Sequence, residues 1–193
     1  RSILRDAVGS VSGARIAAPQ PLSLGAEIDV DAIAACAGLR TDDIVAVNHP
    51  PVVASVGTPF VVAEVASLDA LKRSQPDIGA FRSAADRYPG MQLRFALLLY
   101  VRRDGSPHPL RCRMFAPPGG VFEDPATGSA NAALAALLAS KRPGDSHAFE
   151  IEQGIEMGRP SLLLGGATKD ANGEVRSTIA GSCVSVMTGE MTV

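Results

Sequence analysis

Residues 123–140 read EDPATGSANAALAALLAS, a short polar loop that runs directly into an Ala/Leu segment. Ala and Leu are strong helix formers, and Ala side chains are small enough to let a helix lie close to a sheet. The composition therefore predicts a helix over residues 129–140. Thr127, Gly128 and Ser129 lie where that helix begins.

The chain on both sides of this helix predicts short helices and many strands. Capping residues indicate helices at 30–37 between Asp29 and Gly38, at 68–73 after Ser67, and from Asp77 to about Tyr88. Apolar and β-branched runs predict strands at 14–18, 44–47, 52–56, 60–65, 93–102, 108–115, 148–153, 161–164, 174–180 and 183–187. Turns are expected at 104–105, 154, 165–166, 172–173 and 189. This order favours an α+β domain in which a sheet wraps around the helix at 129–140.

Charge and composition exclude several classes of protein. The 193 residues carry 18 Lys and Arg against 20 Asp and Glu. The net charge of −2 gives no excess of positive charge for binding nucleic acid or an anionic membrane. The longest apolar run, 132–139, is far shorter than the ~18 residues needed to cross a bilayer. Because the first residue is Arg1 and not Met, we expect a processed or partial chain.

The three cysteines form no C-x-x-C pair and the histidines do not cluster, so neither a metal site nor a disulfide framework is predicted. A reducing, cytoplasmic location is the default expectation. Cys112 and Cys183 are expected to be small core residues. His49, before two prolines, and His108, beside a hairpin, are expected at the surface.

The start of the helix at 129–140 is the strongest candidate site. The first amide groups of a helix have no internal partner, and the helix dipole adds about half a positive charge there. Thr127, Gly128 and Ser129 could therefore hold a carboxylate or phosphate, with Gly128 permitting close approach. Asp124, held by Pro125, would lie beside the bound anion and suits proton transfer.

The same spacing also fits an ordinary capped helix that binds nothing, because Asp, Thr, Gly and Ser are typical of helix N-termini. Residues 157–160 (MGRP) leave two readings open as well. Arg159 could lie near a substrate anion, or these residues could be a plain turn before a strand.

Residues 113–117 (RMFAP) and 120–130 (GVFEDPATGSA) resemble the signature of the phenazine-biosynthesis PhzF-like proteins, relatives of diaminopimelate epimerase by fold. Further matching segments are 55–60 (SVGTPF), 153–154 (QG), 157–161 (MGRPS), 180–182 (AGS) and 189–190 (GE). The resemblance runs in family order from about residue 14 to the C-terminus. It implies two similar lobes, each a sheet rolled around a central helix, with the active site in the cleft between them.

The resemblance also implies isomerisation or epimerisation of a small carboxylic acid by proton transfer at carbon, with no cofactor. Asp124 would line the site, and Gly128 and Ser129 would help to bind the substrate carboxylate. Family members also carry a first lobe with an acid/base glutamate and a Gly-His motif. This chain shows neither, because none of its three histidines follows a glycine.

We therefore expect residues 18–180 to form the second lobe, and 1–17 with 181–193 to be remnant strands of an incomplete first lobe. The leading hypothesis is a PhzF-like isomerase. The alternative is a non-catalytic single lobe that binds an anion or a partner, as a homodimer or docked to a first lobe. A racemase or hydroxyproline epimerase is disfavoured, because Asp124 occupies the motif position where those enzymes use cysteine.

Overall fold

The computed structural model describes residues 2–90, 95–106, 108–184, 186–187 and 189–190. Its strands are β1 (Ser2–Arg5), β2 (Val11–Ala17), β3 (Ser23–Glu27), β4 (Ile44–Val45), β5 (Val52–Ser55), β6 (Pro59–Val65), β7 (Leu97–Arg102), β8 (Leu110–Ala116), β9 (Val121–Asp124), β10 (Ser146–Gln153), β11 (Ser161–Lys169) and β12 (Val175–Ser182). Its helices are α1 (Val30–Ala37), α2 (Leu68–Arg73), α3 (Ile78–Arg87) and α4 (Gly128–Ser140), with short 3-10 helices η1 (Thr41–Asp43) and η3 (Pro117–Gly119).

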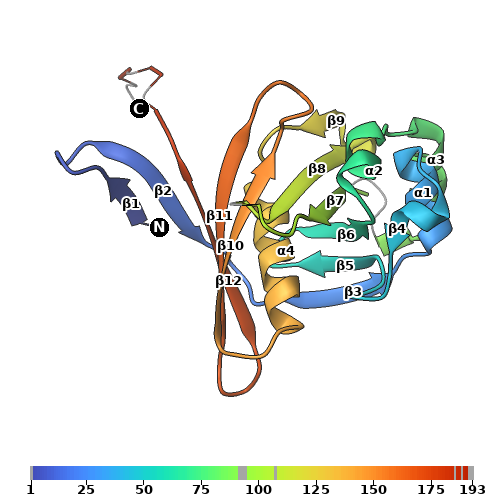
Figure 1. Ribbon diagram of the computed structural model, residues 1–193, viewed down its shortest axis with the longest axis horizontal. Coiled ribbons are helices and arrows are strands. Elements are labelled where there is room, and N and C mark those ends of the chain that lie inside the picture. Colours follow the sequence, from blue (N-terminus) through green and yellow to red (C-terminus); the bar gives the residue numbers. More distant parts are fainter. Residues whose placement is uncertain (1, 91–94, 107, 185, 188, 191–193) are drawn as a thin grey trace.

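Within these residues the strands form one twelve-stranded sheet in the order β1-β2-β12-β11-β10-β8-β7-β6-β5-β3. Two further strands join at the side, β4 on β6 and β9 on β8. The neighbouring pairs are antiparallel except β6 with β7 and β8 with β10. Figure 1 shows that the sheet curves around α4, with β10, β11 and β12 on one side and β5 to β8 on the other.

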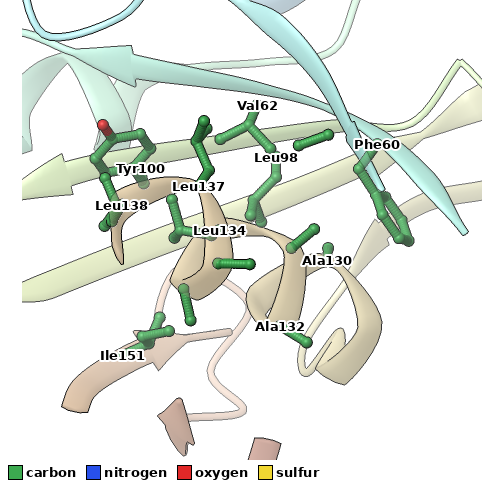
Figure 2. Close-up of a cluster of buried hydrophobic side chains, with 14 of the residues drawn as sticks. Phe60, Val62, Leu98, Tyr100, Ala130, Ala132, Leu134, Leu137, Leu138 and Ile151 are labelled. Atoms are coloured by element: carbon green, nitrogen blue, oxygen red, sulfur yellow. The ribbon is translucent and has the colours of Figure 1, made fainter. Parts of the chain in front are cut away.

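Helix α4 is the centre of the larger hydrophobic core. It begins at Gly128, one residue before the predicted start, and every residue from Ala130 to Ala139 is buried. Figure 2 shows its leucines and alanines among apolar side chains of the sheet, with Phe60 on the side of Ala130 and Tyr100 on the side of Leu138. A helix that is apolar all round has to be enclosed, so the Ala/Leu composition accounts for its place. The predicted α+β fold with a sheet around this helix is confirmed.

The remaining helices α1, α2 and α3 cover the opposite face of the central strands. Along β7, Leu97, Leu99 and Val101 pack in the core beneath these helices, whereas Leu98 and Tyr100 pack against the α4 core. Successive side chains of a strand point to opposite faces. The central strands are therefore buried on both faces, which explains their continuous apolar sequences.

Two of the three predicted helix starts are capped as expected. The side chains of Ser67 and Asp77 accept hydrogen bonds from the amides of Ala70 and Ala80, at 3.0 and 2.8 Å. Asp29 occupies the third capping position, but its side chain makes no cap and accepts from the hydroxyl of Tyr88 instead.

Two local predictions were wrong. The expected turn at 165–166 lies inside β11. A Cβ at Gly165 would lie 3.0 Å from the Cβ of Ala135 in α4, so this glycine allows a close approach of helix and strand and does not mark a turn. The expected strand at 183–187 is absent from its described residues, although the Cys183 amide donates a hydrogen bond to the carbonyl of Ser12 in β2.

The hairpin of β1 and β2 extends away from the body of the molecule (Figure 1). β2 pairs with β12, and β1 is the edge strand at this end of the sheet. Ile3, Val8 and Val11 of this hairpin are 63, 85 and 52 % exposed. The division into residues 1–17 with 181–193 and residues 18–180 stays a prediction.

Candidate functional site

Two adjoining cavities lie at the N-terminus of α4. One of about 430 Å³ is lined by Ala126 and Gly128 together with residues of β2, β11 and β12. The other, of about 260 Å³, is lined by Gly128 and Ser129 together with Val56 and Thr58. Among the described residues, those that line either cavity carry no charge.

The first turn of α4 leaves main-chain donors for a ligand. Across the described residues no side chain caps this helix, so its first N–H groups retain their hydrogen-bonding capacity and the positive end of the dipole. Gly128 does not have a positive φ, and a Cβ there would lie 3.6 Å from Ile179, an ordinary contact. Packing and backbone geometry therefore do not require glycine at position 128.

Asp124 and Thr127 form a separate pair beside these cavities and line neither of them. The Thr127 hydroxyl donates a hydrogen bond of 2.7 Å to Oδ2 of Asp124. Thr127 is buried and Asp124 is half-buried. Of the predicted site residues, Gly128 and Ser129 thus line a cavity, while the hydroxyl of Thr127 is bound to Asp124.

Sequence reasoning gave no role to two buried amides that hold this pair. Gln153 and Asn131 have no exposed surface, and both contact Thr127. One signal was available, because Gln153 follows Phe149 and Ile151 at a spacing of two, on the inward face of β10. A polar residue in such an apolar series indicates an internal hydrogen-bonding partner.

Arg159 lies apart from the predicted anion site. The residue is exposed, and it lines neither cavity, although the following Pro160 and Ser161 line the larger one. Its main chain closes the turn after β10, because Arg159 N donates to the carbonyl of Gly154 at 2.9 Å.

Several of the short motifs meet at the two cavities. Val56 and Thr58 come from the motif at 55–60, and Pro160 and Ser161 come from the motif at 157–161. The motif at 180–182 lines the larger cavity in full. Segments that are far apart in the chain, such as 56–58 and 180–182, therefore converge on the N-terminus of α4.

A second polar cluster surrounds Tyr100, and it overturns one surface prediction. His49 is only 4 % exposed, and its Nε2 lies 2.8 Å from the Tyr100 hydroxyl, which donates to Glu64 at 2.7 Å. Burial lowers the pKa of His49 below its ordinary value. Burial, aided by the charge of Glu64, raises that of Tyr100. Buried partners distant in sequence thus account for the position of His49.

The cysteines divide into two buried thiols and one exposed thiol. Cys36 and Cys112 are buried, whereas Cys183 is exposed, so its predicted core position was wrong. Burial raises the pKa of Cys36 to about 12 and raises the pKa of Cys112 as well. Neither buried thiol is therefore a thiolate base at neutral pH.

The described residues contain no group of three or more His, Cys, Asp or Glu side chains that could hold a metal ion. They also contain no helix long and apolar enough to span a membrane.

Comparison with known proteins shows the family of this chain. A family model described as phenazine biosynthesis-like protein, PhzC-PhzF, matches residues 6–189. The chain belongs to this family. An uncharacterized isomerase of Mesorhizobium japonicum is 36 % identical over 177 residues, which are 90 % of this chain and 57 % of that protein. A trans-2,3-dihydro-3-hydroxyanthranilate isomerase of Pseudomonas fluorescens is 36 % identical over 131 residues, 66 % of this chain and 42 % of that protein.

The fold agrees with a solved member of the PhzC-PhzF family. A phenazine biosynthesis protein of Bacillus anthracis superposes with a TM-score of 0.77 at 24 % identity, over 93 % of this chain and 60 % of that chain. This likeness shows the fold. The present chain spans about half the length of the curated relatives it matches.

Proposed function

We propose that this chain forms the carboxylate-binding part of an isomerase that moves a proton at a carbon atom of a small carboxylic acid, without a cofactor. The supporting observation is the uncapped N-terminus of α4 beside two cavities whose lining, in the described residues, carries no charge. In such surroundings the amides of the first turn and the helix dipole would supply the countercharge that a carboxylate needs. The hydroxyl of Ser129 would add a further donor.

Asp124 is the proposed proton-transferring group, since its carboxylate accepts from Thr127, the residue between the cavity-lining Ala126 and Gly128. Thr127 would act through its hydrogen bond to Asp124. Arg159, exposed beside the larger cavity, would attract the anionic substrate at longer range. The Pseudomonas fluorescens relative supports this substrate class, because its name specifies a cyclic hydroxy amino acid, trans-2,3-dihydro-3-hydroxyanthranilate.

Isomerisation removes a proton from one carbon and returns a proton to another, by one acid–base group or by two. We propose that a complementary lobe carries the second acid–base group, a glutamate, on the opposite side of the cleft. Residues 1–17 and 181–193 would belong to that lobe. The chain's span of 57 % of the Mesorhizobium relative is consistent with this division.

Asp124→Asn tests the catalytic proposal. We expect about a 100-fold fall in kcat on trans-2,3-dihydro-3-hydroxyanthranilate, because the amide cannot accept the transferred proton. The melting temperature should change by no more than a few degrees, since Asp124 is only half-buried. Both are measured on the intact protein, by product formation and by calorimetry. Unchanged turnover with a large loss of stability would show that Asp124 has only a structural role, as the hydrogen-bond partner of Thr127.

Gly128→Ala is the matched variant for the binding step. Its new methyl group fits beside Ile179 and would lie at the cavity where a carboxylate is proposed to bind. We expect KM to rise about tenfold while the unfolding midpoint is unchanged. An unchanged KM would place the substrate elsewhere.

The exposed apolar side chains of β1 and β2 favour one second candidate, a binding module that docks on another copy of this chain. β1 is the last strand in the sheet order and offers an edge to such a copy. Sedimentation velocity should then show a species of twice the chain mass that dissociates in Val8→Lys. A monomer at micromolar concentration would rule this candidate out.

A further inference from the structure

Four polar side chains around the loop before α4 form hydrogen bonds that have a fixed direction, namely Asp124 of β9, Thr127 of the loop, Asn131 of α4 and Gln153 of β10. Asn131 and Gln153 are fully buried, Thr127 is 7 % exposed, and together they connect the main chain of the loop to the carboxylate of Asp124. The direction of each bond follows from main-chain groups, which are either donors only or acceptors only.

Main-chain groups of Thr127 fix the orientation of the side-chain amides of Asn131 and Gln153. Asn131 Nδ2 lies 2.9 Å from the Thr127 carbonyl, which only accepts, so the atom at this position is the NH2 group. The same NH2 donates to Gln153 Oε1 at 2.6 Å, and the Thr127 main-chain N–H donates to that oxygen at 3.2 Å. Two donors therefore face one atom of the Gln153 amide, which has to be its oxygen.

The NH2 group of Gln153 then faces the other way, and its two hydrogens are both used. One is donated to the main-chain carbonyl of Asp124 at 2.6 Å and the other to Thr127 Oγ1 at 3.1 Å. A hydroxyl carries a single proton. Because Thr127 Oγ1 already accepts from Gln153, its own proton is directed to Asp124 Oδ2, 2.7 Å away.

We propose that Gln153 is a positioning residue which, through Thr127, holds the side chain of Asp124 in one orientation. A hydrogen bond from a fixed donor to one carboxylate oxygen restrains the orientation of the whole carboxylate. Asp124 would thus enter the reaction as the proton acceptor, with Oδ1 receiving the proton. The consequence for catalysis rests on the proposed function, whereas the direction of the hydrogen bonds does not.

The unaltered protein tests the hydrogen-bond direction directly. Neutron diffraction from crystals exchanged into D2O should show the Thr127 deuteron on the line to Asp124 Oδ2 and two deuterons on Gln153 Nε2. A Thr127 deuteron that points to Gln153, or a deuteron on Asp124 Oδ2, would overturn the proposal. This readout needs neither a substrate nor a folded variant.

Variants test the effect of Gln153 on turnover. Thr127→Val removes the donor to Asp124, and Gln153→Glu keeps the shape of the side chain but lacks two N–H groups. We expect each to lower kcat about 10- to 100-fold with little change in KM, as for loss of a hydrogen bond to a charged group. Thr127→Ser retains the hydroxyl and should stay within about threefold of the unaltered protein.

The double variant separates positioning from general packing. If Gln153 acts through Thr127, then Gln153→Glu in the Thr127→Val background should cause no further loss of kcat. Losses that multiply, or a Thr127→Ser protein as slow as Thr127→Val, would contradict the proposal. If the unaltered protein has no isomerase activity but the neutron result holds, the proposed function fails and the assignment of the Asp124 orientation stands.

Discussion

Gly154→Ala is expected to lower the free energy of unfolding by about 4 kcal/mol, the sum of a strained backbone and a steric clash. Gly154 has a φ of +78°, where side chains other than hydrogen are disfavoured. A Cβ there would lie 2.6 Å from the carbonyl oxygen of Pro125 and closer still to that of Arg159. Both obstacles are main-chain atoms, so neither can rotate away, and the loop before α4 would have to move.

Gly158→Ala is the matched control for Gly154→Ala. Gly158 also has a positive φ, +69°, but nothing lies within 4 Å of a Cβ built there. We expect a cost of about 1 kcal/mol, the backbone contribution alone. Urea denaturation followed by circular dichroism measures both variants. Equal costs at the two positions would show that close packing of the 154 and 159 main chains is unimportant for stability.

Arg113→Met should be similarly severe, at about 4 kcal/mol, because it removes one partner of a buried ion pair. Arg113 binds Glu123 through two hydrogen bonds of 2.8 Å, and the two side chains are 9 and 12 % exposed. Its Nη1 also donates to the main-chain carbonyls that end α2, those of Leu71, Lys72 and Ser74. The variant would leave the Glu123 carboxylate and these carbonyls without their donor.

The effect of Arg113→Met should extend to the site, since Glu123 immediately precedes Asp124 on β9. Arg176→Met is the control, because the Arg176–Glu174 pair is 59 and 42 % exposed and its loss should change stability by less than about 0.5 kcal/mol. Thermal unfolding of both variants distinguishes them. A loss at Arg113 no greater than at Arg176 would mean that the buried pair has no net effect on stability.

Local signals in the sequence predicted most of the helices and strands. The ends of α1 and α2 were predicted to the residue from Asp29, Gly38 and Ser67, because helix ends favour particular residue types locally, even though the Asp29 side chain makes no cap. The central position of α4 followed equally directly from its Ala/Leu composition. The position of the candidate site at the N-terminus of α4 was predicted from the same few residues.

Features that depend on contacts between distant segments were not predictable from one sequence. A turn was predicted at Gly165 because the sequence alone does not distinguish a glycine in a turn from a glycine in a strand that packs against a helix. The burial of His49 depends on Tyr100, 51 residues away. The hydrogen bonds of Gln153 depend on the side-by-side placement of β10 and the loop before α4, which no local pattern reveals.

The unequal burial of the three cysteines makes site-specific labelling feasible without mutation. Maleimides react with accessible thiolates, so Cys36 and Cys112, buried and with raised pKa values, should stay unmodified in the folded protein. Cys183 is exposed and directly follows Ser182, which lines the larger cavity, and its amide is bonded to Ser12. A fluorophore attached there would report on ligands and on neighbouring chains from a single known position.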